Sequence, residues 1–149
     1  MENNVRILIV EDEGAIIEHL KARFKNEFEF VEAYSYLSAI GNWNKYQGIF
    51  DCIIIDLQIS LEGLEEDERS DNYYPLIGLA FIEDICKKFD PEGKMNLLKK
   101  MIIFSGFINN LKNGDYKKKD WILDNIQCIA KDSDSIQTLV DKIKEIVYE

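Results

Sequence analysis

Residues 5–13 read VRILIVEDE, a continuous apolar run that ends abruptly in three carboxylates. Three later runs are also short, apolar and followed directly by a polar residue: CIII at 52–55, MIIF at 101–104 and IQCIA at 126–130. Such runs are typical of strands buried on both faces of a parallel sheet. A fifth run, FEFVEAY at 28–34, alternates more between apolar and polar residues, and we predict an outer strand there.

Apolar residues at helical spacing fill the intervals between these strands. The stripes are Ile16, Ile17, Leu20 and Phe24; Leu37, Ile40 and Trp43, weakened by Gly41; Leu79, Ile82, Ile85, Cys86 and Phe89; and Ile136, Leu139, Val140, Ile143, Ile146 and Val147, with Asp132 and Ser133 as candidate caps. A further helix is expected at Tyr116–Asn125. Strands that alternate with helices predict an α/β fold, here a flavodoxin-like (βα)5 doubly wound parallel sheet with strand order 2-1-3-4-5.

The length and composition limit the classes of protein that fit. A chain of 149 residues predicts a single domain covering residues 1–149. Its net charge of −10 argues against direct binding to nucleic acid or to an anionic membrane, and favours cations or partners with basic patches. No apolar run approaches the roughly 20 residues of a membrane span. Three scattered cysteines, Cys52, Cys86 and Cys128, fit reduced core residues, and we expect a cytoplasmic protein.

The chemistry is expected at the carboxyl ends of the strands, where the strand order reverses between the first and the third strand. Glu11 and Asp12 follow the first strand and Asp56 follows the third, so their carboxylates should share one pocket. Two like charges about 4 Å apart repel by about 4 kcal/mol at an effective dielectric near 20. A divalent cation would offset that repulsion, and Mg²⁺ prefers such oxygen ligands. Ser105 and Lys131 end the fourth and fifth strands beside this pocket.

This residue set suits phosphoryl transfer, which depends on positioning and on neutralising the phosphoryl oxygens. Asp56 is the candidate nucleophile, because a carboxylate can itself form an aspartyl phosphate. Glu11 and Asp12 would then hold the metal. Lys131 would pair with the phosphoryl group, and the Ser105 hydroxyl would donate a hydrogen bond to it.

Four segments together resemble the CheY-like receiver domain of two-component response regulators: RILIVEDE at 6–13, FDCIIIDL at 50–57, IIFSG at 102–106 and IAK at 129–131. The resemblance implies that Asp56 is the phosphoacceptor and that Glu11, Asp12, Asp56 and the backbone carbonyl of Gln58 hold Mg²⁺. It implies a switch hydroxyl at Ser105 and a phosphoryl-binding lysine at Lys131. It also implies that phosphate comes from a histidine kinase or a histidine phosphotransfer protein. Such a protein catalyses its own phosphorylation and dephosphorylation and is not a metabolic enzyme.

In receivers, phosphorylation changes the face formed by the fourth helix, the fifth strand and the fifth helix, and thereby protein–protein interactions. A downstream protein is the implied partner, and a homodimer through the same face remains open. Two residues on the output half depart from the family pattern: Cys128 stands where an aromatic switch residue is common, and Asp132 stands where proline usually follows the lysine.

The chain also carries an acidic insertion at about 59–75, between the third strand and the third helix. A solvated loop is its simplest interpretation, and a flap over the site or a docking segment is the functional one. Two alternatives to a working receiver stay open. One is a degenerate receiver that is not phosphorylated and acts as a binding module. The other is an Mg²⁺-dependent phosphohydrolase with an aspartyl nucleophile, although its usual second aspartate is missing after Asp12.

Overall fold

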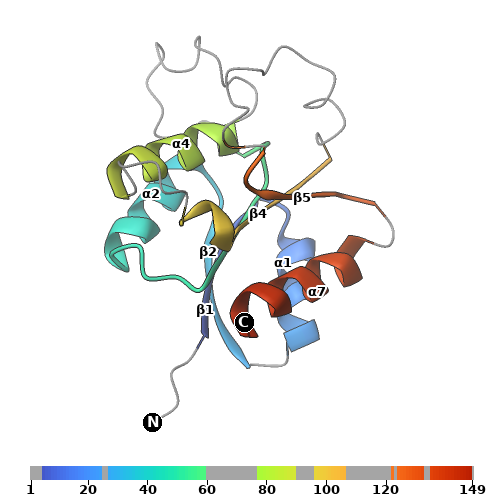
Figure 1. Ribbon diagram of the computed structural model, residues 1–149. Helices are drawn as coiled ribbons and strands as arrows, with labels where there is room; N and C mark the ends of the chain where they lie inside the picture. Colours follow the sequence, from blue (N-terminus) through green and yellow to red (C-terminus); the bar gives the residue numbers. More distant parts are fainter. Residues whose placement is uncertain are drawn as a thin grey trace.

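The computed structural model of the chain describes residues 5–24, 27–59, 77–89, 96–106, 122, 124–132 and 135–148. These residues include a five-stranded sheet (Figure 1) formed by β1 (Val5–Val10), β2 (Phe28–Ala33), β3 (Cys52–Ile55), β4 (Met101–Ser105) and β5 (Gln127–Ala130). All four strand pairings are parallel, and the order is β2-β1-β3-β4-β5. The predicted flavodoxin-like fold is therefore confirmed, and every strand matches its predicted run to within one residue at each end.

Helices cover both faces of this sheet. On one side lie α2 (Tyr36–Lys45) and α4 (Ile77–Phe89), and on the other lie α1 (Gly14–Phe24) and α7 (Ser135–Tyr148). A short 3₁₀ helix, η1 (Leu98–Lys100), leads into β4. The helix expected at Tyr116–Asn125 falls mostly outside the described residues, as does the insertion at 59–75 except for buried Ile59. None of the described helices has the length and apolar character needed to cross a membrane.

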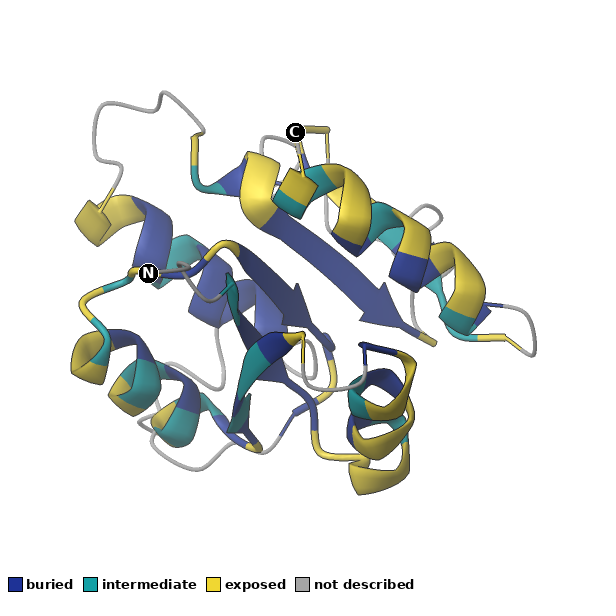
Figure 2. Cartoon of the chain, turned by 90° about the horizontal axis from the view of Figure 1, so that it is seen from below, coloured by how far each residue is buried: buried dark blue, intermediate teal, exposed yellow. Residues whose placement is uncertain are grey.

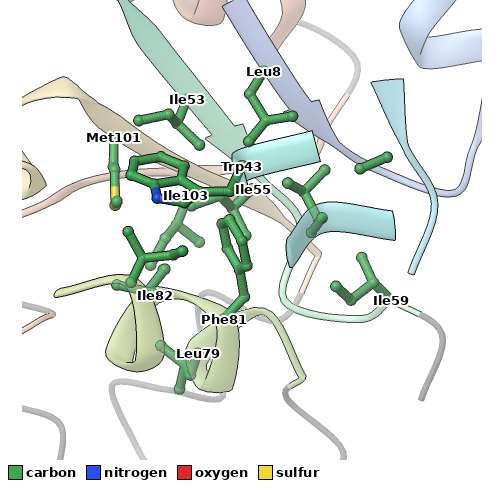
Figure 3. Packing of buried hydrophobic residues seen from close by; sticks show 14 of the residues in the cluster. Leu8, Trp43, Ile53, Ile55, Ile59, Leu79, Phe81, Ile82, Met101 and Ile103 are labelled. Atoms are coloured by element: carbon green, nitrogen blue, oxygen red, sulfur yellow. The ribbon is translucent and has the colours of Figure 1, made fainter. Parts of the chain in front are cut away.

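Two hydrophobic cores lie on the two faces of the sheet because successive side chains of a strand point to opposite faces. In β1, Leu8 and Val10 face the core under α2 and α4, whereas Ile7 and Ile9 face the core under α1 and α7. Trp43 of α2 fills the centre of the first core against strand and α4 side chains (Figure 3). The central strands are buried and the helices expose their outer surfaces (Figure 2), as their sequence patterns predict.

Three predictions about burial were wrong. β5 was expected to be buried on both faces, but it is an edge strand that pairs only with β4 within the described sheet, and only Ile129 in it is buried. Cys128, which was predicted to be a core residue, is consequently only half-buried, whereas Cys52 and Cys86 are buried as predicted. Leu37 was predicted on the apolar face of its helix, but it is exposed. The buried residues of α2 are Ala39 and Trp43 instead.

Helix α2 starts at a reciprocal cap and continues through its glycine. The Ser35 hydroxyl accepts the backbone N–H of Ser38 at 3.0 Å, and the Ser38 hydroxyl accepts the backbone N–H of Ser35 at 2.9 Å. This capping box satisfies two N–H groups that the helix itself cannot pair. Gly41 lies inside the helix without ending it.

Candidate functional site

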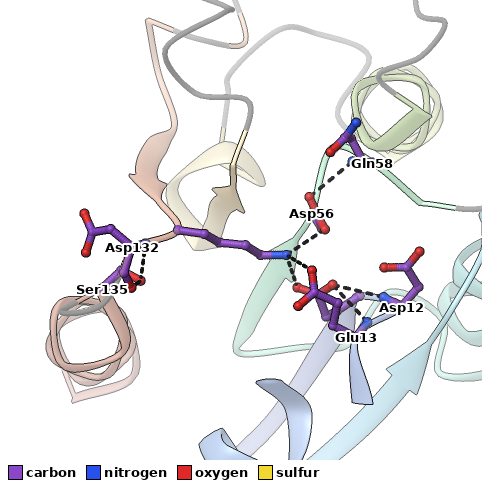
Figure 4. Close-up of polar contacts among 8 residues, drawn as sticks. Asp12, Glu13, Asp56, Gln58, Asp132 and Ser135 are labelled. Carbon is purple, nitrogen blue, oxygen red and sulfur yellow. Dashed lines mark hydrogen bonds and ion pairs between the residues drawn. The ribbon is translucent and has the colours of Figure 1, made fainter. Parts of the chain in front are cut away.

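Four of the predicted site residues meet at the carboxyl edge of the sheet (Figure 4). Glu11 follows β1 and Asp56 follows β3, and these two side chains are buried, whereas Asp12 is exposed. One carboxylate oxygen from each of Glu11, Asp12 and Asp56 lies within 4.8 Å of the other two. The strand register fixes this arrangement: the Asp56 N–H donates to the Val10 carbonyl at 2.8 Å, so β3 ends beside the end of β1.

Lys131 supplies the positive charge of the site. It follows β5 directly, and its side chain reaches the carboxylates that follow β1 and β3. The Nζ atom lies 2.8 Å from Glu11 Oε1, 2.8 Å from Asp56 Oδ2 and 3.5 Å from Glu13 Oε1. Burial alone would lower the pKa of Lys131, but hydrogen bonds from its ammonium to Asp56 and Glu11 outweigh burial and hold that pKa above its usual value. The ammonium therefore stays charged among these carboxylates.

The other oxygens of the two buried carboxylates accept backbone hydrogen bonds. Glu11 Oε2 accepts the N–H groups of Asp12 at 3.1 Å and Glu13 at 3.2 Å, at the turn that leads into α1. Asp56 Oδ1 accepts the N–H of Gln58 at 3.2 Å. All four carboxylate oxygens of Glu11 and Asp56 thus have a hydrogen-bonding partner, and neither side chain is free to rotate without losing one.

Burial makes the charge on Glu11 costly. It raises the pKa of the Glu11 carboxyl from 4.5 to about 7, against the opposing effect of the hydrogen bond from Lys131, while the nearby Asp56 carboxylate raises it further. Perturbed carboxyl groups of this kind gather at functional sites and at structural ion pairs alike. A compact divalent cation bound to the same oxygens would favour the ionised form.

Gly78, near the start of α4, lies against the backbone of the Asp56 loop. A Cβ atom at this position would be 2.4 Å from the Asp56 carbonyl oxygen and 2.9 Å from Leu57 Cα. The Gly78 N–H donates to the Leu57 carbonyl at 2.9 Å. The absence of a side chain therefore lets α4 pack directly onto the loop that carries Asp56.

Ser105 and Gln58 join the site through their backbones. Ser105 is fully buried at the end of β4, and its carbonyl accepts the N–H of Lys131 at 3.2 Å. Gln58 is exposed, and its N–H holds Asp56 as described above. The backbone N–H of Asp132, which follows the lysine, donates to the Ser135 hydroxyl at 3.0 Å at the start of α7.

Sequence reasoning missed two residues of this site. Glu13 was visible in the acidic triplet after β1, but only the structure places its carboxylate beside Lys131, far away in sequence. Gly78 carries no chemical group, and its contact with Asp56 depends on how α4 packs.

The donor set fits a hard divalent cation, and Mg²⁺ in particular. It offers carboxylate oxygens from Glu11, Asp12 and Asp56, and Mg²⁺ is typically bound through one or two carboxylates while it keeps several waters. Exposed Asp12 provides an accessible oxygen next to two buried ones. Lys131 provides a second cationic group that can neutralise an anion bound next to Asp56.

The chain thus combines an open parallel α/β sheet with an acidic cluster and a lysine at the carboxyl edge of that sheet. Comparison with solved structures shows which known domains share this fold. The receiver domain of the Francisella response regulator 1452 is 18% identical, covers 97% of this chain and 98% of its own, and has a TM-score of 0.64. The non-phosphorylated HemR receiver domain from Leptospira biflexa is 18% identical, covers 98% of this chain and 96% of its own, and has a TM-score of 0.64.

The response regulator TrrA from Thermotoga maritima, solved in complex with Mg²⁺-BeF, is 22% identical with coverage of 95% of this chain and 98% of its own, and has a TM-score of 0.62. Neither a protein-family model nor a curated protein matches the chain. The chain therefore has the CheY-like fold of response regulator receiver domains, and the predicted resemblance is confirmed at the level of the fold.

Proposed function

We propose that this chain is a phosphorylatable receiver, in which Asp56 accepts a phosphoryl group from a histidine kinase or a histidine phosphotransfer protein. In this proposal residues 1–149 form one receiver domain, and the acidic insertion at about 59–75 follows the phosphoacceptor. The observation that carries the proposal is the contact of Asp56 with Lys131 at 2.8 Å inside a cluster with Glu11 and Asp12, on a receiver fold.

Glu11, Asp12 and Asp56 would hold Mg²⁺, together with the backbone carbonyl of Gln58. The carboxylate cluster supports this assignment, and so does the similarity to TrrA, which was solved with Mg²⁺-BeF. When bound, the metal would neutralise charge on the phosphoryl oxygens. The assignment of Gln58 rests on its place two residues after Asp56 in the motif, and on the backbone hydrogen bond that fixes this turn.

The reaction would transfer the phosphoryl group from a nitrogen atom of the donor to an oxygen atom of Asp56. A carboxylate oxygen of Asp56 attacks phosphorus, an O–P bond forms, and the P–N bond to the donor imidazole breaks with its electron pair returning to nitrogen. Lys131 already donates to Asp56 and would stabilise negative charge on the transferred group. The buried Ser105, at the end of the neighbouring strand, is the candidate hydroxyl donor to the same group.

The product of the reaction would be a changed surface for protein–protein interaction, with an unidentified downstream protein as the partner. Phosphorylation would draw Lys131 and Ser105 toward the phosphoryl group and bias β5, which carries half-buried Cys128 three residues before the lysine. The expected cytoplasmic location is part of this proposal, and the lack of a disulfide bond among Cys52, Cys86 and Cys128 is compatible with it.

Incubation with acetyl phosphate, followed by measurement of the intact mass, tests this proposal. We expect the wild type to gain one phosphoryl group only when Mg²⁺ is present, and Asp56→Asn to gain none. Asp51→Asn, at an exposed aspartate before β3, is the matched control and should behave as the wild type does. A wild type that stays unmodified with acetyl phosphate and with a phosphorylated donor protein would favour the degenerate binding module. Steady release of inorganic phosphate from phosphomonoesters would favour the phosphohydrolase.

A further inference from the structure

The Lys131 side chain crosses the end of β4 on its way to the site. Lys131 follows β5, whereas its ammonium contacts Glu11 after β1 and Asp56 after β3, both at 2.8 Å. Because β4 lies between β3 and β5 in the sheet, the side chain must pass over the last residues of β4. Holding so flexible a side chain in one direction costs conformational entropy, which further contacts must offset.

The Phe104 ring lies at this crossing. Phe104 is the residue before Ser105 in β4, pairs with Ile129 of β5 and is buried. The Lys131 Nζ atom lies over the Phe104 ring, 5.7 Å from the ring centroid. A cation within about 6 Å of a ring centroid is attracted by the negative face of the ring. The Lys131 side chain is only 17% exposed, so water screens this attraction less than it would at an open surface.

The ring differs from the other partners of the ammonium because its attraction does not depend on ionisation. The ion-pair partners of Lys131 are the carboxylates of Glu11, Glu13 and Asp56. Their attraction for the ammonium changes when a carboxyl group is protonated, and that of Asp56 changes when its oxygen carries a phosphoryl group. The Phe104 ring is uncharged in each of these states, so it can hold Lys131 in place throughout a reaction at Asp56.

We propose that Phe104 is a positioning residue, whose aromatic face holds the Lys131 ammonium over the end of β4 and so directs it at Asp56. This inference rests on the proposed function, because it concerns how Lys131 stabilises the group transferred to Asp56. A lysine that is already aligned needs less reorganisation during the transfer. Phe104 acts through Lys131 and not on the phosphoryl group itself.

Graded weakening of the ring tests the inference, with the rate of phosphorylation by acetyl phosphate and Mg²⁺ as the readout. Phenylalanine analogues with increasing numbers of ring fluorine atoms keep nearly the same shape, but fluorine withdraws electron density from the ring face and weakens its attraction for a cation. At Phe104 these analogues should slow phosphorylation stepwise, and Phe104→Leu should slow it by about three- to tenfold. The same analogues at Phe81, which is also buried but in the core on the other face of the sheet, should leave the rate unchanged.

NMR of the unmodified protein gives an independent readout. The face of an aromatic ring shifts nearby protons upfield, so the Hε signal of Lys131, assigned with Lys131→Arg, should move downfield in Phe104→Leu. A rate that stays constant across the fluorinated series, or a Lys131 signal that is the same in Phe104→Leu, would overturn the inference. If Phe104→Leu does not fold, the fluorinated variants keep the core filled and decide. A wild type that gains no phosphoryl group would instead refute the proposed function, and the Lys131 signal would then decide whether Phe104 holds the lysine.

Discussion

Replacing Gly78 by alanine should destabilise the protein, although alanine is the better helix former. The added Cβ would lie 2.4 Å from the Asp56 carbonyl oxygen, so the two groups must separate by at least 3.0 − 2.4 = 0.6 Å to reach the shortest distance that real Cβ contacts show. Overpacking of this kind costs about 1–3 kcal/mol. The higher helix propensity of alanine returns about 0.5–1 kcal/mol. Because the nearest atoms belong to the backbone and cannot rotate away, the cost should lie in the upper part of this range, about 2–3 kcal/mol, and we expect a net loss of about 1–2 kcal/mol in the free energy of unfolding.

Gly41→Ala is the matched control, because Gly41 lies inside α2 and a Cβ there would meet no atom within 4 Å. It should stabilise the protein by about 0.5–1 kcal/mol, so the two variants should move in opposite directions in urea denaturation. Gly78→Ala should also slow phosphorylation of Asp56 by about tenfold or more, because the displaced carbonyl belongs to that residue. Equal stabilities for Gly78→Ala and the wild type would refute the close approach of α4 to the Asp56 loop.

Two further predictions concern titration and capping. Because burial raises the Glu11 pKa from 4.5 to about 7, its contribution to stability is complete below pH 4.5 and is lost as the pH rises through 7. Between pH 4.5 and pH 7 the urea midpoint of the wild type should therefore fall relative to the midpoint of Glu11→Gln. If the midpoints of the two proteins change with pH in parallel, that result would contradict the raised pKa of Glu11. Ser35→Ala removes the cap of α2 and should cost about 1 kcal/mol. Thermal unfolding measures that loss, with Lys144→Ala at an exposed position of α7 as the control. An unchanged midpoint for Ser35→Ala would show that the cap does not stabilise the helix.

The sequence predicted the sheet well because each strand is a short apolar run bounded by polar residues. The runs at 5–10 and 52–55 match β1 and β3, and the alternating run at 28–34 lies at the edge as expected. The exposure of β5 was not predicted from its run, because IQCIA has the composition of a buried strand, although the predicted order 2-1-3-4-5 already places the fifth strand at an edge of the sheet.

The candidate site was predictable to the extent that strand ends determine it. Glu11, Asp56 and Lys131 follow β1, β3 and β5, and parallel strands bring their carboxyl ends to one edge. The partners of individual oxygens were not predictable, because they depend on side-chain rotamers and on the turn into α1. For the same reason the contact between Lys131 and Glu13 appears only in three dimensions.

The central claim is that Asp56 carries the phosphoryl group, and chemical trapping of the modified residue tests it most directly. The protein is incubated with acetyl phosphate and Mg²⁺ and reduced with borohydride, which converts an aspartyl phosphate to homoserine. Peptide mass spectrometry then locates the change. We predict homoserine at position 56 and at no other aspartate, and only in samples that contained Mg²⁺. Homoserine at Asp12 or another aspartate, or none in a sample whose intact mass shows phosphorylation, would contradict the assignment of Asp56.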